Sequence, residues 1–488
     1  MRAAVKHCVI MTSTFMPRLK PAVTSRVMTV ASVGSLIIAA FITVAVIRGM
    51  RHDWIPFRAE TGVPPYAHFL VHHARTWWGS LIGSELAWSV LYVATLGVIV
   101  RLSSERGVVP LIVCSGVLLS VALFSTPLPL DSDQYAYVGY ADAVNHGRNP
   151  YVLERLPANA TPAERAVSAH WKNPLIRDVY GPGWTLLDAA IMSPFTHLSA
   201  WRQARIERMM AVAALWICAW ALWSFLDGSA ARRFALAALV LNPLVVVEIA
   251  NGAHNDVMMV MFALLALVAA RRERPLLAAL LLGCAASMKF AYLPLVLPFA
   301  AWTFARFGLR TACAAAATSL CVFLATALPF GLAASIAQPL ASVRGPGPLI
   351  AYYLWRAAYH LGARGSSEHP FTYVIPALLC VALVGASYAL ARRRRPEVLI
   401  ACVIVGLLLM AEKLEPWYAM ELVPLLAIPR PWAVSVFAGL TVAMLIPEGT
   451  ILTKAYPVVL TALVAVTASV AAWLAVREPR RITLAIEA

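Results

Sequence analysis

The sequence contains few charged residues. Only 13% of its 488 residues are Asp, Glu, Lys or Arg, whereas a soluble domain carries about a quarter. Hydrophobic residues make up 61%, and apolar runs close to the ~20 residues that span a bilayer recur along the chain. These runs are continuous and do not alternate in polarity, which argues against a β-barrel. The sequence therefore predicts an all-α polytopic membrane protein.

Cysteine pairs at metal-binding spacing are also missing. The eight cysteines include no CxxC pair, and most of them fall inside apolar runs. They are typical of small core residues and not of a disulfide framework or a zinc site. His68, His72 and His73 have a spacing suited to a metal ion, but no third ligand is suggested, so we interpret them as interfacial polar residues. We predict no cofactor, while the sequence leaves a divalent metal open.

No cleavable signal peptide is evident, and the net charge of +16 does not indicate a nucleic-acid partner. The basic residues stand in short clusters between apolar runs, as in cytoplasmic loops of membrane proteins. These clusters lie at 231–233, 271–274, 306–310, 392–395 and 477–481. Residues 1–26 are basic and lead into a full-length apolar run, which predicts a retained anchor with a cytoplasmic N-terminus.

The loop charges predict one transmembrane domain over 27–476, followed by a cytoplasmic tail over 477–488. We expect about 13–15 transmembrane helices, beginning with spans near 27–48, 82–101 and 108–129. Two long loops, 131–182 and 333–370, then fall on the outer face. The apolar segment 183–199 breaks this alternation. Either it is re-entrant, or Arg202, Arg205 and Arg208 lie on the outer side.

Two carboxylates, Asp131 and Asp133, follow the third predicted span directly. A carboxylate at a membrane interface can act as a general base on a hydroxyl within hydrogen-bonding distance. The alternative is that these acids cap the next helix, and their spacing alone favours capping.

The stretch NPLVVVEIANGAHNDVMMVMF, residues 242–262, carries a second polar group. Glu248 sits in an apolar run, and His254, Asn255 and Asp256 cluster where the chain turns back. Ionisable residues beside a span are costly, so a functional role is the default hypothesis. His254 could donate to a phosphate with Asp256 orienting it. A polar interfacial turn explains Asn255 and Asp256 equally well, but it explains Glu248 poorly.

Two later stretches place polar groups at the same predicted face. Lys289 interrupts an apolar stretch and either snorkels to the interface or binds a lipid-linked phosphate. Trp417 and Tyr418 begin a later span, with Glu421 one turn deeper. Such aromatic residues are ordinary interface anchors, but an aromatic platform beside a carboxylate also holds sugars. The 131–182 loop adds further aromatic residues, among them Tyr135, Tyr137, Tyr140, Tyr151 and Tyr180.

Five motifs in one order resemble the GT-C glycosyltransferases that use polyprenyl-phosphate sugars. They are DSDQY, GRNPY, YGP, NPLVVVEIANGAHND and EPWY, and they run from about residue 131 to 425. The sequence is most similar to polyprenol-phosphate-mannose-dependent α-mannosyltransferases. The resemblance implies a GT-C-like fold and an outward-facing site in the cytoplasmic membrane.

The resemblance also implies an inverting transfer of a sugar, most readily mannose, from a polyprenyl-phosphate donor to a glycan or glycolipid acceptor. Asp131 or Asp133 would be the general base, and His254 and Lys289 would stabilise the leaving phosphate. The expected sugar- and acceptor-binding residues are Tyr135, Tyr137, Tyr180, Glu248, Asn255, Asp256, Trp417 and Tyr418.

Two other classes of function remain open. A secondary transporter or flippase of envelope precursors would also place charged residues in the membrane, but it predicts midplane charges and internal repeats. The polar clusters here stand at the outer ends of spans, and no repeat is evident. An assembly subunit for envelope biogenesis would leave Glu248, Asp256 and Lys289 without a role.

Overall fold

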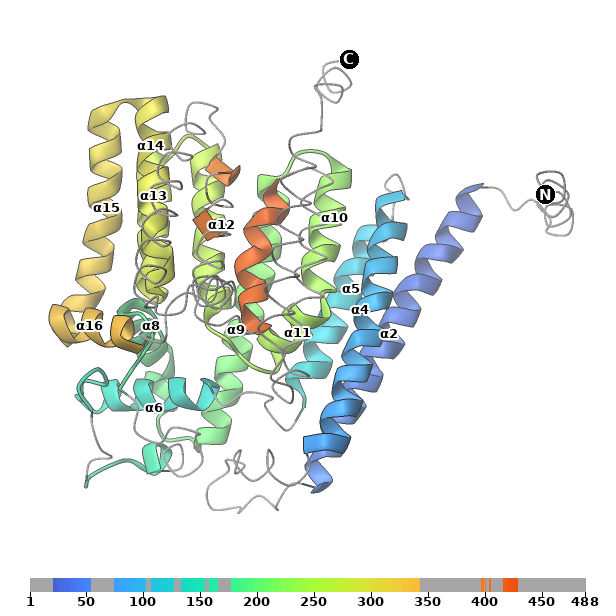
Figure 1. Ribbon diagram of the computed structural model, residues 1–488, viewed down its shortest axis with the longest axis horizontal. Coiled ribbons are helices and arrows are strands. Elements are labelled where there is room, and N and C mark those ends of the chain that lie inside the picture. The colour runs from blue at the N-terminus through green and yellow to red at the C-terminus, as the bar shows by residue number, and fades with distance from the viewer. Residues whose placement is uncertain are drawn as a thin grey trace, which may run out of the picture.

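The described part of the chain forms a helical bundle with further helices lying across one end (Figure 1). The computed structural model describes residues 21–53, 74–101, 107–126, 133–153, 158–165, 177–342, 396–398, 400, 403–404 and 416–428. Every regular element within these ranges is a helix, which confirms the predicted all-α class.

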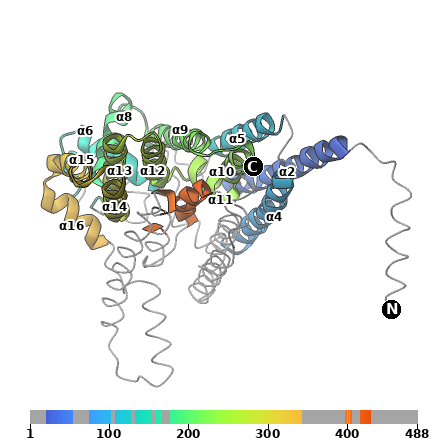
Figure 2. The ribbon, with the colours of Figure 1, turned by 90° about the horizontal axis from the view of Figure 1, so that it is seen from above.

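The first three helices lie side by side at one edge of the bundle (Figures 1 and 2). They are α2 (Pro21–Asp53), α4 (Ala74–Arg101) and α5 (Val108–Phe124). On α2, Leu36 and Ile47 are buried while Ile38 and Phe41 are exposed. One face therefore packs on neighbouring helices and the other presents apolar side chains, as expected of a helix in contact with lipid.

Two short helices, α6 (Asp133–Asn145) and α8 (Pro182–Met192), lie near one end of the bundle, and α6 runs across it (Figure 1). The 3-10 turn η1 (Ser193–Phe195) follows α8. With 11 residues, α8 is about 16 Å long and cannot cross a ~30 Å hydrocarbon core. The apolar segment 183–199 is thus no span, and the next long helix begins after it.

That long helix is α9 (Ala200–Phe225), whose first turns contain Arg202, Arg205 and Arg208. Arg208 contacts the Gln134 side chain of α6. These arginines therefore lie at the α6 end of the bundle, and their placement on the outer side of the membrane stays a prediction.

A break separates α10 (Ser229–Val240) from α11 (Pro243–Ala250), which meet at 53°. Proline disfavours helical geometry in the residue before it, and Asn242 is extended. The Asn242 side chain then accepts hydrogen bonds from the backbone N–H groups of Leu244 and Val245. The Asn-Pro pair therefore ends one helix and caps the next, which re-aims the chain toward α6.

The remaining helices complete the bundle. They are α12 (Asp256–Arg271), α13 (Pro275–Met288), η2 (Phe290–Leu295), α14 (Val296–Phe307), α15 (Leu309–Ala327), η3 (Leu328–Phe330), α16 (Leu332–Ser342) and η4 (Pro416–Ala427). In Figure 2, η4 lies between the α2–α4 side and the α13–α15 side. It contacts α11 and α12, so a late segment of the chain reaches the middle of the molecule.

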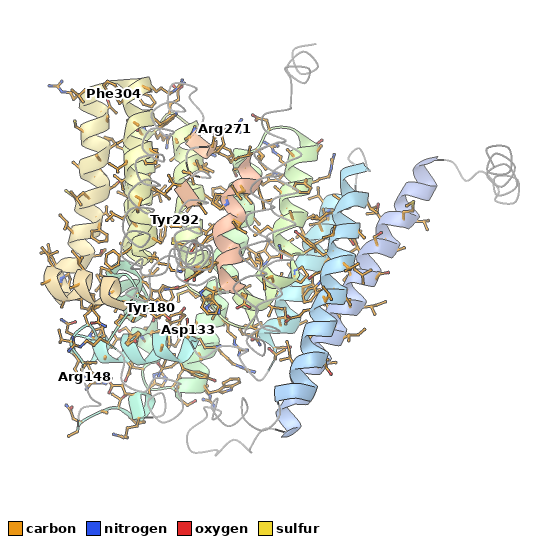
Figure 3. All side chains as sticks on the ribbon, in the orientation of Figure 1. Asp133, Arg148, Tyr180, Arg271, Tyr292 and Phe304 are labelled. Carbon is orange, nitrogen blue, oxygen red and sulfur yellow. The ribbon has the colours of Figure 1, made fainter. Side chains whose placement is uncertain are left out.

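The described basic clusters gather at the end of the bundle opposite α6. Arg271, at the end of α12, pairs with Asp227, and Arg306, at the end of α14, pairs with Glu273. Figure 3 shows Arg271 at one end and Asp133 toward the other. The helices thus separate a basic end from the end that carries the predicted acidic motif.

Four described helices are long and apolar enough to cross a membrane, or five if the bent α10–α11 pair is one span. Val27–Gly49 coincides with the predicted first span, and shorter apolar helical stretches, Gly83–Ile99 within α4 and Val108–Phe124, lie at the next two. The expected total of 13–15 includes stretches outside the described residues and stays a prediction, as do the tails and most of the 333–370 loop.

Candidate functional site

The first residue of α6, Asp133, lies beside the turn that joins α11 to α12. Its Oδ2 is 3.8 Å from Nδ1 of His254, and the other ring nitrogen, Nε2, is 3.1 Å from Oε2 of Glu248. The His254 and Glu248 side chains are almost fully buried, whereas that of Asp133 is 22% exposed. The imidazole therefore stands between two carboxyl groups, and only the Asp133 carboxyl is open to a bound molecule.

The local backbone explains how His254 reaches this position. After α11 the chain turns through Ala253, whose φ of 58° is left-handed and unusual for a residue with a side chain. A Cβ atom on Gly252 would come within 2.6 Å of the Glu248 carbonyl oxygen and 2.8 Å of His254 Cδ2. The turn is thus too tight for a side chain at Gly252, and it folds His254 back over Glu248.

An aromatic ring from the late segment covers the imidazole. Trp417 of η4 stacks on His254, with ring centroids 4.2 Å apart and an interplanar angle of 12°. One face of the indole is therefore occupied by His254. An indole face also attracts a cation, so a protonated imidazole would be stabilised by Trp417 as well as by its two carboxyl neighbours.

Two tyrosines, Tyr137 and Tyr180, also lie beside Asp133. Tyr180 lies close enough to Asp133 for the two groups to interact electrostatically, and its ring meets that of Tyr137 edge-on at 4.9 Å. Burial and the nearby Asp133 charge raise the pKa of Tyr180 well above its ordinary value, so the phenol keeps its proton as a donor. Tyr137 also accepts a 3.4 Å hydrogen bond from the backbone N–H of Asn255.

The YGPGW turn owes its glycines to a close contact with α13. The Gly181 N–H donates to the Met288 carbonyl oxygen at 3.1 Å, and a Cβ on Gly181 would lie 2.7 Å from the Met288 carbonyl carbon. The motif therefore ties Tyr180 to the end of α13, directly before Lys289.

Asp178 supports this turn from within. It accepts hydrogen bonds from the Thr185 hydroxyl at 2.6 Å and from the Tyr180 N–H at 2.9 Å. Tyr151 reaches the same place, donating to the Tyr180 carbonyl oxygen at 2.9 Å. Burial raises the pKa of the Asp178 carboxyl to about 7, against hydrogen bonds that lower it.

Lys289 lies in a second group of charges next to the first. Its Nζ is 2.5 Å from Asp256 Oδ1 and 3.3 Å from Glu421 Oε1, and it stands 4.3 Å from the centre of the Tyr418 ring. The Lys289 side chain is 24% exposed, while both acids are buried. Lys289 therefore faces acids in the protein interior and does not simply snorkel.

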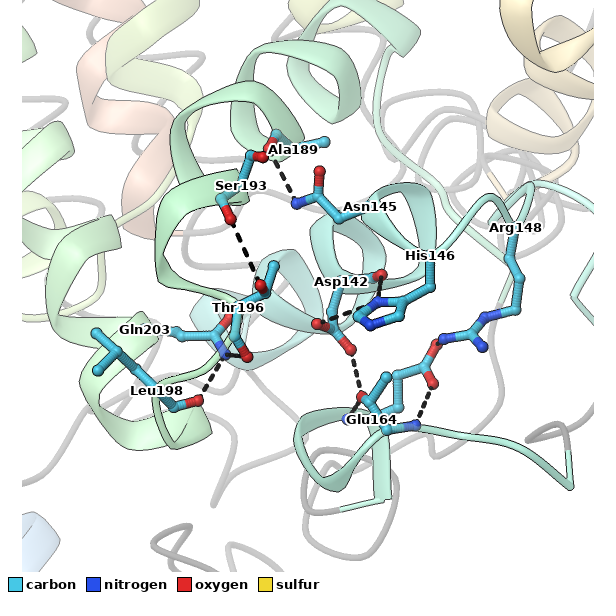
Figure 4. Close-up of polar contacts among 11 residues, drawn as sticks. Asp142, Asn145, His146, Arg148, Glu164, Ala189, Ser193, Thr196, Leu198 and Gln203 are labelled. Atoms are coloured by element: carbon cyan, nitrogen blue, oxygen red, sulfur yellow. Dashed lines mark hydrogen bonds and ion pairs between the residues drawn. The ribbon is translucent and has the colours of Figure 1, made fainter.

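A separate polar cluster joins α6 to segment 158–165 (Figure 4). Asp142 accepts a hydrogen bond from the Thr161 hydroxyl, and Arg148 pairs with Glu164 at 2.5 Å. Thr161 and Glu164 also exchange side-chain to backbone hydrogen bonds of 2.8 and 3.1 Å, the pattern of a capping box. This cluster holds segment 158–165 on α6, away from Asp133.

Most of the predicted site residues meet in these two groups. Asp133, Tyr137, Tyr180, Glu248, His254, Asn255 and Trp417 belong to the first, and Asp256, Lys289 and Tyr418 to the second. Asp131 lies outside the described residues. The Tyr135 side chain packs with Val138, Ala163, Ala200 and Ala204, so it faces α9 and not the Asp133–His254 pair.

Some expected contacts differ from those observed. The carboxyls at the His254 nitrogens belong to Glu248 and Asp133, whereas Asp256, which we expected to orient His254, pairs with Lys289. Glu421, noticed in the sequence only for its depth, completes the Lys289 group. In the part of the chain that the structure describes, no three His, Cys, Asp or Glu side chains converge as metal ligands.

Comparison with known proteins gives one family. A family model described as the MptA/B family, alpha-(1->6)-mannopyranosyltransferase, N-terminal domain, matches residues 28–306. The match covers more than half of the chain and contains both charge groups except for the η4 residues. The chain matches no curated protein.

Proposed function

The chain belongs to the α-(1→6)-mannopyranosyltransferase family of GT-C membrane enzymes, and from this premise we propose that it moves mannose from a polyprenyl-phosphate donor to a glycan or glycolipid acceptor. The observation that carries the proposal is the Asp133–His254–Glu248 group at the start of α6. It combines one partly exposed carboxyl with a ring held between two acids, which suits a proton acceptor beside a group that stabilises negative charge.

Asp133 is the proposed general base. The 6-hydroxyl of the acceptor sugar attacks the anomeric carbon of the donor mannose, and Asp133 takes the hydroxyl proton as the new C–O bond forms. The bond from the anomeric carbon to the phosphate oxygen breaks at the same time, and its electron pair stays on the polyprenyl phosphate. The neighbouring Tyr180 hydroxyl, which keeps its proton, is the proposed donor that orients this carboxyl.

His254 and Lys289 are the proposed partners of the leaving phosphate. His254 lies against buried Glu248, and Lys289 pairs with buried Asp256, so both side chains are fixed in place before the donor arrives. Such preorganised donors stabilise a leaving group without reorganisation during the reaction. The two basic groups face four carboxyls, from Asp133, Glu248, Asp256 and Glu421, so these six groups supply no excess positive charge, and the proposed phosphate contact rests on the N–H donors of His254 and Lys289.

Direct displacement inverts the anomeric carbon. An enzyme that makes an α-(1→6) bond in one displacement therefore needs a β-linked mannosyl phosphate as donor. The proposal consequently separates two anomers of the same lipid: the β-phosphate should be a substrate, and the α-phosphate should not.

Aromatic side chains supply the proposed sugar contacts. Tyr137 and Tyr180 lie beside Asp133, and Trp417 and Tyr418 approach from η4. Asn255 and Asp256 stand at the start of α12 between the two groups. Sugars are held by aromatic faces together with hydrogen-bonding groups, and both kinds are present here.

We propose further that this site faces outward from the cytoplasmic membrane. The support is the basic end of the bundle around Arg271 and Arg306, which lies opposite Asp133. Basic ends of membrane helices favour the cytoplasmic side. Donor and acceptor would then meet at headgroup level, in contact with membrane lipid.

The test is mannose transfer by protein in nanodiscs, with radiolabelled polyprenyl β-phosphomannose and a short α-mannoside acceptor. Asp133→Asn should lower the rate by about 10²–10⁴-fold, the usual contribution of a general base. Asp142→Asn is the matched control, because Asp142 lies on the same helix but faces segment 158–165. Full activity of folded Asp133→Asn would remove Asp133 as the base and leave Asp131, for which Asp131→Asn in the same assay is the test.

Transfer of no mannose by folded protein, from either anomer, would contradict the proposed reaction. The family match favours a transferase over the transporter or flippase that membrane-buried charges also suggest. Counterflow of an envelope precursor into proteoliposomes that contain the purified protein, without sugar transfer, would reverse that preference.

A further inference from the structure

A fully buried arginine, Arg208, links the two chain segments that flank the acidic motif. Its Nε donates to Gln134 Oε1 at 3.0 Å, and its Nη1 donates to the carbonyl oxygens of Thr126 at 2.8 Å and Phe124 at 3.4 Å. One guanidinium thus binds the end of α5 on one side of residues 127–132 and the start of α6 on the other.

The contacts of Arg208 continue into a closed ring. The Gln134 side-chain amide donates to the Asn251 carbonyl oxygen at 3.2 Å, and the Asn251 amide donates to the Thr126 hydroxyl at 2.7 Å. Thr126 is in turn bound by Arg208. Arg208, Gln134, Asn251 and Thr126 therefore form a ring of buried polar side chains, all fully shielded from solvent.

This ring touches the chain next to both members of the Asp133–His254 pair. Gln134 follows Asp133 directly, and Asn251 begins the tight turn that carries His254. The ring members themselves contact neither a donor nor an acceptor in the proposed reaction. They fix the start of α6 against the α11–α12 turn, and with it the separation of Asp133 from His254.

A contribution to stability does not by itself explain a buried arginine at position 208. Removing a guanidinium from water is costly, and well-packed apolar side chains often replace buried charges without loss. A planar guanidinium is suited instead to binding several oxygens at set angles, which a lysine cannot reproduce. The carbonyls that it binds stand at the end of α5, where the helix dipole also favours a positive charge.

We propose that Arg208 is a positioning residue of the transferase, holding Asp133 and His254 in register through Gln134 and Asn251. This inference rests on the proposed function. A displacement of reacting groups by about 1 Å can lower the rate by about 100-fold. Loosening the ring should therefore lower kcat more than it changes the KM for the acceptor.

The first test compares Arg208→Gln with Arg208→Lys in the mannose-transfer assay. Arg208→Gln should lower kcat by about 10- to 100-fold, with the acceptor KM within about 3-fold of wild type. Arg208→Lys keeps the positive charge but lacks the planar guanidinium with its several N–H donors, so it should avoid only part of that loss. The matched control is Arg205→Gln, because Arg205 is one turn away and also stands over the Trp201 ring but is exposed, and this change should leave kcat unchanged.

The second test asks whether Arg208 acts through Asp133. Adding Arg208→Gln to Asp133→Asn should lower the residual rate by less than about 2-fold, because the positioned base is already gone. A full additional 10-fold loss would show that Arg208 acts elsewhere and would overturn the inference. Wild-type kcat in folded Arg208→Gln would overturn it as well.

A milder variant covers the case in which Arg208→Gln does not fold. Gln134→Met keeps the side-chain length and leaves the Arg208 bonds to the Thr126 and Phe124 carbonyls in place. It should lower kcat by about 10-fold per folded molecule, and an unchanged kcat would contradict the inference. Failure of the proposed function is separate, since wild-type protein would then transfer no mannose at all.

Discussion

The imidazole of His254 and the indole of Trp417 stack almost parallel, although 163 positions of sequence separate them. Their centroids lie 4.2 Å apart at 12°, and Glu248 and Asp133 stand at the ring nitrogens. A segment near residue 420 therefore completes the surroundings of a group whose other members lie between residues 133 and 254.

Replacing Trp417 should weaken the charge stabilisation that His254 provides. Trp417→Leu removes the stacked face and should lower kcat by about 3- to 30-fold, since a cation over an indole gains about 0.5–2 kcal/mol. Trp417→Phe keeps an aromatic face and should lose less. The initial rate of mannose transfer at saturating donor and acceptor measures the effect. An unchanged kcat in Trp417→Leu would show that the stacking has no part in catalysis.

Removing Lys289 alone should destabilise the protein more than removing Lys289 together with one of its two acidic partners. Lys289→Met leaves Asp256 and Glu421 buried without their cation, which typically costs about 3–5 kcal/mol. Adding Glu421→Gln removes one of the two uncompensated charges and should restore part of the melting temperature. Thermal unfolding in detergent provides the measurement, and a double variant less stable than Lys289→Met would contradict the ion-pair account.

Because of the Asp178 carboxyl, the free energy of unfolding should fall as the pH rises. Its carboxyl keeps a proton in the folded protein up to a pKa of about 7, whereas the ordinary value is 3.8. The folded state thus binds more protons between these values, so the contribution is present below about pH 4 and is lost as the pH rises toward 7. The difference across that window is on the order of 4 kcal/mol. Asp178→Asn should flatten the melting temperature between pH 4 and 8, and parallel curves for both proteins would contradict this assignment.

A methyl group at Gly181 should disrupt the turn that carries Tyr180. The added Cβ would lie 2.7 Å from the Met288 carbonyl carbon, so backbone must shift, at a cost of about 1–3 kcal/mol. Gly97→Ala is the control, because a Cβ there has no heavy atom within 4 Å. Gly181→Ala should lower both the melting temperature and the transfer rate, while Gly97→Ala should change neither. Equal behaviour of the two variants would show that the close approach to α13 is dispensable.

The sequence predicts the helical class, apolar helices at the first three expected spans and most of the residues that the structure brings together around His254 and Lys289. Local patterns suffice for these features, because long apolar runs identify membrane helices and polar residues beside them stand out. The short length of α8 in the apolar segment 183–199 needed the structure, since an 11-residue helix cannot be told from part of a span by its apolar residues alone.

Contacts between distant segments could not be predicted in the same way. Lys289 and Glu421 are 132 positions apart, and no local pattern joins them. Asp178 stands beside Arg177 in a polar loop, where an exposed residue is the ordinary expectation. Tyr135 and Tyr137 looked equivalent, but two positions on a helix differ by about 200°, so only Tyr137 meets Tyr180.

The place of η4 in the middle of the bundle has a consequence for biosynthesis. A chain is made and inserted from its N-terminus, so Lys289 and His254 enter the membrane well before residues 416–427 exist. During that interval Lys289 has Asp256 as a partner but lacks Glu421, and His254 lacks the indole of Trp417. Maturation of the site is thus coupled to the arrival of η4, and a nascent chain released after α16 would hold the acidic motif without the groups that complete it.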